Sequence, residues 1–194
     1  MTQPDAKPLT DTEEKILDAA IPTFVRYGAR KTSMNDIAAV AGVSRQTIYD
    51  SFGGKDGVIR ASIRKVTDAN LACVEARLKQ TSGLSDQLDA YFAETIVKSF
   101  ELIQTAGDVE DLITGHNEAG KDEIARSHAR HVALVERLLN PFATQLAKHG
   151  LSPNQQASYI VTVAMGFKSG ISQRAELDMM LHILRVNSLR VTGQ

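Results

Sequence analysis

The stretch MNDIAAVAGVSRQTIYDSF, residues 34–52, decides the fold of this chain. Its first half places Ile37, Ala38 and Ala41 on one side of a short helix. Gly42 follows at the position where the chain has to turn with a left-handed conformation, which glycine adopts at little cost. The pattern predicts a short helix that ends in a tight turn.

A second short helix is expected directly after this turn. Ser44 can cap its N-terminus, and Ile48 and Phe52, four residues apart, can hold it to a core. Two helices that cross at a steep angle touch only where the contact residue is small, and Ala38 is such a residue. The second helix can then present its outer face and its N-terminus to the major groove of DNA.

The outward side chains of this second helix are of types that contact DNA. Arginine bonds guanine bidentately and glutamine bonds adenine, so Arg45 and Gln46 are candidate base contacts. Thr47 can contact a thymine methyl group or a phosphate, Tyr49 can bond a phosphate oxygen, and Lys55 can pair with another phosphate. The same helical hairpin also occurs in proteins that never meet DNA, so the bare pattern leaves that alternative open.

The rest of the chain also favours helices. Apolar residues recur at helical spacing in most segments and no segment resembles a strand, so we expect an all-α protein of about nine helices. Pro22 is expected to kink the first helix on its outer face, and Pro141 to bend or split the helix predicted over residues 121–149.

Composition excludes several classes of protein. The single Cys73 rules out an internal disulfide and a cysteine-cluster metal site. No apolar run approaches the roughly 18 residues of a membrane span, and the first residues lack the order of a signal peptide, so we expect a cytoplasmic protein. The net charge of −1 is neutral evidence, but between Arg26 and Gln46 four basic residues stand against Asp36 alone, a local charge of +3.

Residues 16–59 resemble the N-terminal domain of the TetR family of bacterial transcriptional repressors. The matching positions are Ile16, Leu17, Ala19, Ala20, Phe24, Gly28, Thr32, Ile37, Ala38, Ala41, Gly42, Val43, Ser44, Thr47, Ile48, Tyr49, Phe52 and Lys55. The resemblance implies that Thr32 or Ser33 contacts phosphate together with Tyr49 and Lys55. It implies base or groove contacts for the start of the second helix. The predicted DNA-binding residues are Thr32, Ser33, Ser44, Arg45, Gln46, Thr47, Tyr49 and Lys55.

The resemblance also implies a division of the chain. We expect a disordered arm over residues 1–9, a helix-turn-helix DNA-binding domain of three helices over residues 10–54, and a helical effector-binding and dimerisation domain over residues 55–194. The chain departs from the family pattern at Asp50 and Ser51, and Gly53 and Gly54 make the following turn looser than is usual in the family.

The last two helices indicate a dimer independently of the resemblance. The helix predicted over residues 175–191 is apolar on two faces, and both faces must be buried, one of them outside its own domain. Small residues in the preceding helix permit close approach, so a two-fold interface of four helices is expected. The alternative is a monomer with both helices internal. The expected interface residues are Ala157, Ile160, Val161, Ala164, Leu177, Met180, Leu181, Leu184 and Ser188.

The effector is expected to be an amphipathic organic molecule bound among the helices of residues 55–172. The candidate pocket residues, each of which could equally be plain core or surface, are Phe92, Phe100, His116, Asn117, His131, Met165 and Phe167. His128 and His131 are three apart on a helix, but without a nearby carboxylate pattern a solvated face is favoured over a metal site. No metal or cofactor is expected.

These observations favour a ligand-responsive transcriptional regulator, most readily a repressor. As a homodimer it would bind a palindromic operator in double-stranded DNA, without a membrane partner, and a small organic effector would release it. A helical interaction module without DNA binding is the alternative. An all-helical enzyme is least favoured, because the sequence has no phosphate loop, HExxH motif, nucleophile elbow or paired carboxylates with a histidine.

Overall fold

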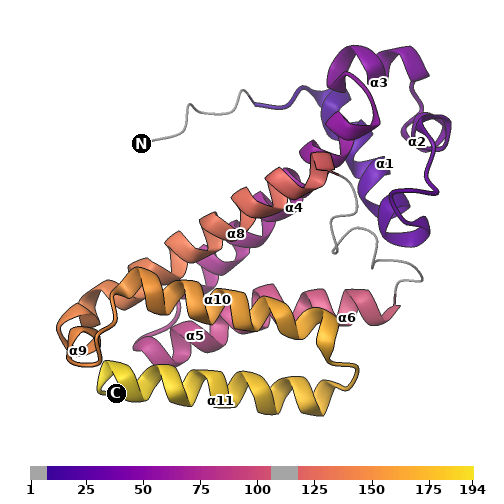
Figure 1. The fold of residues 1–194 in the computed structure, drawn as a ribbon. Coiled ribbons are helices and arrows are strands. Elements are labelled where there is room, and N and C mark those ends of the chain that lie inside the picture. Colours follow the sequence, from indigo (N-terminus) through magenta and orange to yellow (C-terminus); the bar gives the residue numbers. More distant parts are fainter. Residues whose placement is uncertain (1–7, 106–117) are drawn as a thin grey trace. The chain divides into compact units, whose positions relative to one another are not determined.

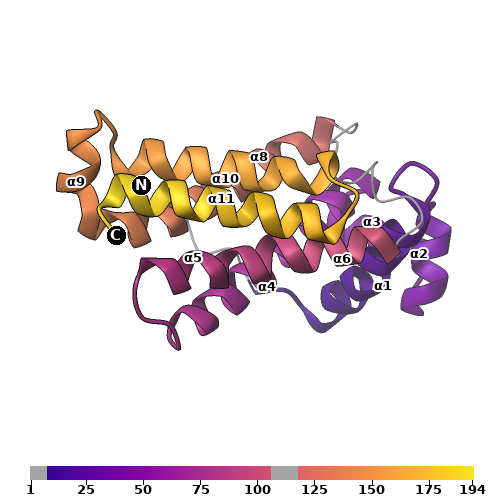
Figure 2. The same ribbon diagram turned by 90° about the horizontal axis from the view of Figure 1, so that it is seen from below.

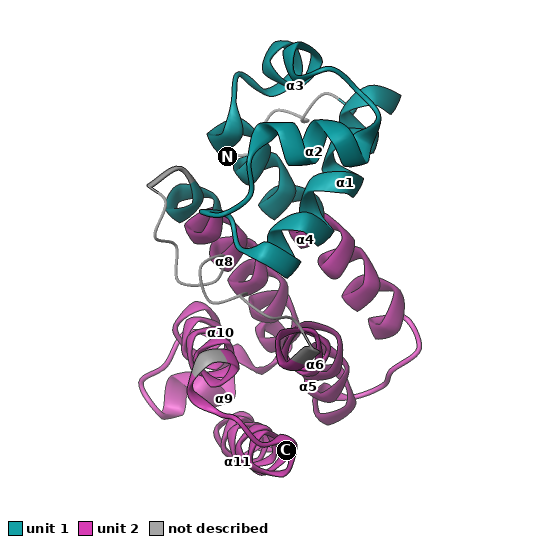
Figure 3. Cartoon of the chain, turned by 90° about the vertical axis from the view of Figure 1, so that its right-hand side faces the viewer, with its two compact units in different colours: residues 1–65, 106–123 teal, residues 66–105, 124–194 magenta. Residues whose placement is uncertain are grey.

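The computed structural model describes residues 8–105 and 118–194, and these form helices with no strand among them. The chain divides into two compact units, coloured separately in Figure 3. Within the described residues, the first unit comprises 8–65 and 118–123, and the second comprises 66–105 and 124–194. The expected all-α fold is therefore confirmed.

The first unit is built from α1 (Asp11–Tyr27), α2 (Met34–Ala41), α3 (Arg45–Phe52) and the start of α4 (Lys55–Leu78), as Figure 1 shows. Thr10 caps α1 in a reciprocal arrangement with Glu13: the Thr10 hydroxyl accepts from the Glu13 amide, and the Glu13 carboxylate accepts from the Thr10 amide. Pro22 lies inside α1, which continues past it for another five residues to Tyr27.

The core of the first unit joins all four helices. Ile16 and Phe24 of α1, Ile37 of α2 and Ile48 of α3 are fully or almost fully buried and belong to one apolar cluster. Val58, in the first turn of α4, is buried in the same cluster. The unit therefore extends to residue 65, beyond the domain boundary expected at residue 54.

The second unit contains the remaining helices: the rest of α4, α5 (Leu84–Phe92), α6 (Lys98–Thr105), α8 (Glu118–Leu139, from residue 124 on), α9 (Ala143–Lys148), α10 (Pro153–Gly170) and α11 (Arg174–Thr192). A five-residue π-helical turn, η1 (Ala93–Val97), joins α5 to α6. A 3₁₀ turn, η2 (Asn140–Phe142), contains Pro141 and separates α8 from α9. The split expected at Pro141 is confirmed, because proline cannot donate the helical backbone bond.

The second unit has its own apolar core, to which α4, α5, α8, α10 and α11 all contribute. Leu88, Val135, Val161 and Leu177 are fully buried in it. The consecutive helices α10 and α11 lie side by side in Figures 1 and 2. No described helix is both long and apolar enough to cross a membrane.

Candidate nucleic-acid interface

The turn between α2 and α3 is fixed by local hydrogen bonds. At the start of α2, the Ser33 hydroxyl accepts from the Asp36 amide at 3.2 Å and the Asp36 carboxylate accepts from the Ser33 amide at 2.8 Å. Hydrogen bonding of the Asp36 carboxyl to the Ser33 side chain, and then to the Ser33 amide, lowers the pKa of Asp36. At its end, Gly42 takes φ of 66° and its amide donates to the Ala38 carbonyl. Both predicted helix boundaries are confirmed.

Helix α3 is held to the core by one side and leaves the other side free. The Ser44 hydroxyl accepts from the Thr47 amide at 3.0 Å and so caps the helix, as predicted. Ile48 is fully buried and Phe52 is partly buried against the same core. Gly53, with φ of 73°, ends the helix, and its amide donates a hydrogen bond to the Tyr49 carbonyl. An anchored, sharply bounded helix presents its outer face in a fixed orientation.

The outer face of α3 carries Arg45, Gln46 and Tyr49 around one open hollow. The Arg45 guanidinium lies over the Tyr49 ring, 5.3 Å from its centroid, and donates to the Tyr49 hydroxyl at 3.2 Å. Stacking of this kind orders a long side chain while leaving further N–H donors available. The remaining N–H donors of Arg45 are therefore available for a hydrogen bond to guanine or to a phosphate.

Asp50, one of the departures from the family pattern, is tied to a predicted base contact. The Gln46 side-chain amide nitrogen donates to the Asp50 carboxylate at 2.8 Å. The bond leaves the Gln46 carbonyl oxygen and its second N–H free, which is sufficient for a bond to a base edge. Asp50 is thus placed to orient Gln46.

The remaining predicted contacts lie at the edges of this face. Lys55 donates to the Arg30 carbonyl at 3.2 Å, which links α4 to the segment after α1 and leaves two ammonium protons. Thr47 is partly buried, with its hydroxyl 2.8 Å from that of Ser44. Of the two alternatives for a phosphate contact before α2, Thr32 is buried and its hydroxyl donates to Gly28, whereas Ser33 is exposed. Of the two residues, only Ser33 is therefore accessible for the predicted phosphate contact.

The predicted pocket residues lie in or against the core of the second unit, as far as the structure describes them. Phe92, Phe100 and His131 are buried, and Met165 and Phe167 are partly buried. His116 and Asn117 lie outside the described residues. Tyr91 was not among the predicted pocket residues; it is fully buried, with its ring edge-on to His131 at 5.9 Å between centroids. Tyr91 follows Leu88 by three residues, so helical spacing places the two side chains on the same buried face.

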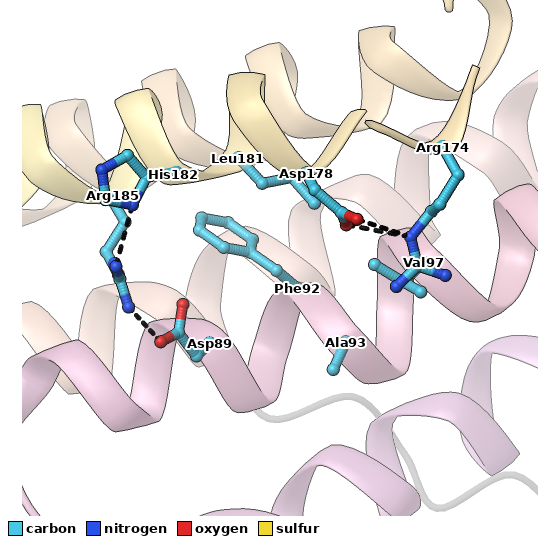
Figure 4. A pocket seen from close by; sticks show the side chains of 9 residues that line it. All are labelled: Asp89, Phe92, Ala93, Val97, Arg174, Asp178, Leu181, His182 and Arg185. Atoms are coloured by element: carbon cyan, nitrogen blue, oxygen red, sulfur yellow. Dashed lines mark hydrogen bonds and ion pairs between the residues drawn. The ribbon is translucent and has the colours of Figure 1, made fainter. Parts of the chain in front are cut away.

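An open hollow of about 240 Å³ lies between α11 and the α5–η1 segment. Figure 4 shows the Phe92 ring between two ion pairs, Arg185 with Asp89 and Arg174 with Asp178. Of the described residues predicted for the pocket, Phe92 is the one that lines it. The charged lining was not predicted, since its members come from helices about 85 to 95 residues apart in sequence.

The two histidines of α8 have different surroundings. The His128 ring lies 3.1 Å from the Thr162 hydroxyl, whereas the Nδ1 atom of His131 is buried and has no hydrogen-bond partner in residues 8–105 and 118–194. Among the residues that the structure describes, no three metal-ligating side chains gather in one place.

Eight of the nine residues predicted for the dimer interface are buried within the single chain: Ala157, Ile160, Val161, Ala164, Leu177, Leu181, Leu184 and Ser188. Met180, the ninth, is partly buried. The buried side chains pack in the core of their own chain, so the interface residues stay a prediction, and the uncovered apolar surface of the two helices lies at other positions. The exposed apolar side chains of α10 and α11 are Tyr159, Met179 and Ile183.

Burial of His131 predicts a loss of stability in acid. Burial, then the charges of Lys168, Arg130 and His128, lower the pKa of His131 from 6.5 to about 4. The unfolded chain binds this proton near pH 6.5 and the folded chain only near pH 4, so stability is complete above pH 6.5 and falls toward pH 4. From pH 7 to pH 5 the loss from this group is about 2 kcal/mol.

Urea unfolding at pH 7 and pH 5 measures this effect. His131→Leu is expected to lose less stability than the wild type over this interval, by about 2 kcal/mol. Equal losses in both proteins would contradict the assignment to His131.

Comparison with known proteins agrees with this geometry. Residues 16–61 match the family model described as "Bacterial regulatory proteins, tetR family". Over 186 residues the chain is 25% identical to the HTH-type transcriptional repressor ComR of Escherichia coli (strain K12), covering 91% of this chain and 87% of that protein. Over 72 residues it is 42% identical to the uncharacterized HTH-type transcriptional regulator YvkB of Bacillus subtilis (strain 168), covering 37% and 36% of the two chains.

The fold has solved counterparts as well. A TetR-family transcriptional regulator from Streptomyces coelicolor superposes with a TM-score of 0.68 at 17% identity, covering 94% of this chain and 96% of that one. The helix-turn-helix segment, the relatives and the shared fold lead to one conclusion: residues 16–61 form the helix-turn-helix domain of the tetR family of bacterial regulatory proteins, and the whole chain resembles helix-turn-helix transcriptional regulators.

Proposed function

We propose that this regulator is a repressor that binds a palindromic operator as a homodimer and is released by a small organic effector. The observation that carries the proposal is the outer face of α3, where Arg45, Gln46 and Tyr49 project from a helix that is capped and anchored on its other side. The relative that matches over nearly the whole chain is named as a repressor, which supports the direction of regulation. Binding to chromosomal DNA would place the protein in the cytoplasm.

The palindrome follows from two-fold symmetry. Two copies related by a two-fold axis present two α3 helices in opposite senses, and adjacent major grooves on one face of DNA are about 34 Å apart. An effector that binds the second unit would act by preferring the conformer whose α3 helices do not fit this spacing.

The test is binding to operator DNA selected from random duplexes, measured by fluorescence anisotropy at several salt concentrations. A repressor that neutralises phosphates should select a palindromic site and bind it with a steep salt dependence. No selected site, or selected sites without two-fold symmetry, would contradict the proposal. The absence of any selected site would favour a helical interaction module that does not bind DNA.

Substitutions on the α3 face separate base contacts from phosphate contacts. Arg45→Ala should weaken operator binding about 10- to 100-fold and relax the sequence preference at one base-pair position in each half-site. Lys55→Ala should weaken all sequences alike and lower the salt slope by about 1 per site. Lys79→Ala, an exposed lysine of the second unit, is the matched control and should change neither. Equal weakening of all sequences by Arg45→Ala would make Arg45 a backbone contact.

A further inference from the structure

Two buried polar side chains and one partly buried lysine, from three different helices, lie at the apolar core of the second unit. They are Tyr91 of α5, His131 of α8 and Lys168 of α10, and we refer to them as the Tyr91 cluster. None of them has a role in holding the fold through a hydrogen bond or ion pair to the side chain of another described residue.

Tyr91 and His131 are buried with unused hydrogen-bonding capacity. Tyr91 is fully buried and His131 is 4% exposed, and their rings meet edge to face with 5.9 Å between centroids. Neither the Tyr91 hydroxyl nor the His131 Nδ1 atom has a hydrogen-bond partner among the described residues. Native proteins rarely leave buried polar atoms unpaired, because an unmade hydrogen bond is costly, and a bound molecule is one source of the missing partner.

Lys168 brings a positive charge to the same region. It continues the stripe of α10 that faces the core, formed by Ala157, Val161 and Ala164, all fully buried. After burial, the charge of Lys168 is the second cause that lowers the pKa of His131. No carboxylate of the described residues pairs with it, and burial lowers the pKa of Lys168 to about 8.

The protonation states give the cluster a single charge at neutral pH. The imidazole of His131 is neutral there, because burial and nearby cations lower its pKa to about 4. Burial raises the pKa of the Tyr91 hydroxyl, which therefore remains a neutral donor. Lys168, with a pKa of about 8, keeps most of its charge. One cation with two neutral hydrogen-bonding groups, surrounded by apolar side chains, complements a monoanion with an apolar body.

We propose that the effector is a small apolar monocarboxylic acid whose carboxylate is bound by the Tyr91 cluster. Lys168 pairs with the carboxylate, the Tyr91 hydroxyl donates to it, and His131 bonds it through the protonated nitrogen of its ring. This inference rests on the proposed function for the role of the acid as an effector, but the binding site itself does not.

Phe92 offers the acid a route to the cluster. Its ring lines the hollow of Figure 4 and also meets the Tyr91 ring at 5.9 Å between centroids. The Phe92 ring therefore contacts both the hollow, with a volume of about 240 Å³, and the Tyr91 ring of the cluster. In the proposed complex the acid enters on this side and its apolar body displaces the Phe92 ring.

The first experiment uses matched pairs of acids and amides with the full-length protein. Thermal unfolding and calorimetric titration are measured with phenylacetate against phenylacetamide and with octanoate against octanamide. At least one acid should raise Tm by several degrees, since a ligand that binds the folded state stabilises it, and its amide should bind at least 10-fold more weakly. No stabilisation by either acid, or equal stabilisation by acid and amide, would overturn the proposal.

Variants assign the binding to the cluster. Lys168→Met should weaken the acid at least 10-fold and remove the preference for acid over amide, and Tyr91→Phe should weaken it several-fold. Lys79→Met, at an exposed position of the same unit, is the matched control and should bind the acid as the wild type does. Unchanged acid binding in Lys168→Met would overturn the proposal.

A second readout needs no ligand. Because Lys168→Met replaces a partly buried cation that pairs with no carboxylate of the described residues by an apolar side chain, the ligand-free variant should have a higher Tm than the wild type. A lower Tm would mean that Lys168 is paired within the fold, which would overturn the site. Operator binding without acid is measured on the same variants. If the wild type did not bind an operator, the proposed repressor function would fail, whereas the acid site would not be affected. If Lys168→Met binds the operator normally, the acid site is tested by Tm and by titration alone.

Discussion

Replacing Gly57 by alanine is expected to abolish operator binding and to destabilise the first unit, although Gly57 contacts no DNA in the proposed complex. Gly57 lies in the first turn of α4, five residues after the last residue of α3. A Cβ atom added there would overlap the carbonyl oxygen of Phe52 and lie 2.8 Å from its carbonyl carbon. These are backbone atoms, so no side-chain rotation relieves the overlap, and the end of α3 has to move.

The expected loss of affinity is large because recognition depends on the orientation of α3. Phe52 ends the recognition helix, and a shift there turns Arg45 and Gln46 away from the base edges they are proposed to read. We expect at least a 100-fold loss of operator affinity and a loss of about 1–3 kcal/mol in the free energy of unfolding, as for other overpacked sites. Fluorescence anisotropy and urea unfolding followed by circular dichroism measure the two effects.

Gly166→Ala is the matched control for this substitution. Gly166 also lies inside a helix, α10, but an added Cβ there meets no atom within 4 Å. Alanine should therefore stabilise the chain by about 0.5–1 kcal/mol through its better helix propensity, with operator affinity unchanged. If Gly57→Ala behaved like this control, the close approach of α4 to α3 would not be what sets the orientation of the recognition helix.

Local features of the helix-turn-helix could be predicted from sequence because each depends on residues within one helical turn. The caps at Ser33 and Ser44 and the left-handed Gly42 follow from short-range hydrogen bonding and steric rules. The pairing of Gln46 with Asp50 was equally local, at i and i+4, but the acid was interpreted only as a departure from the family pattern.

The second unit was predicted less well, since its arrangement depends on which of two apolar faces a helix turns inward. Leu184 and Ile183 are neighbours in sequence, and periodicity alone does not distinguish the face of α11 that packs on its own unit. Similarly, nothing local indicates that Tyr91, His131 and Lys168, which lie about 40 residues apart in sequence, face the same core. The π-helical turn η1 was not predicted either, because it has no local sequence signature.

The distinction between the two faces of α11 leads to the second large prediction, which concerns the dimer. Ile183→Glu is expected to produce a folded monomer. Ile183 is 45% exposed, Met179 is 53% exposed and Tyr159 on the adjacent α10 is 51% exposed, so these side chains leave apolar surface uncovered on one chain. In a two-fold interface each substitution occurs twice, and two buried, unpaired carboxylates would cost more than the interface gains.

Sedimentation and operator binding measure the result. Ile183→Glu should sediment as a monomer with a Tm close to that of the wild type, whereas Leu184→Glu, at a position only 3% exposed, should unfold the chain and is no test of the dimer. Val66→Glu, an exposed apolar position on α4, is the control for the added charge and should remain dimeric.

Operator affinity should fall at least 100-fold in Ile183→Glu, since two separate monomers lose the high effective concentration that links the half-sites. The monomer should still bind one half-site weakly with unchanged sequence preference, because α3 and its supports lie in the first unit and the substitution lies in the second. A dimer that survived Ile183→Glu would place the interface elsewhere on the chain. A monomer that kept full operator affinity would contradict the palindromic, two-fold mode of binding itself.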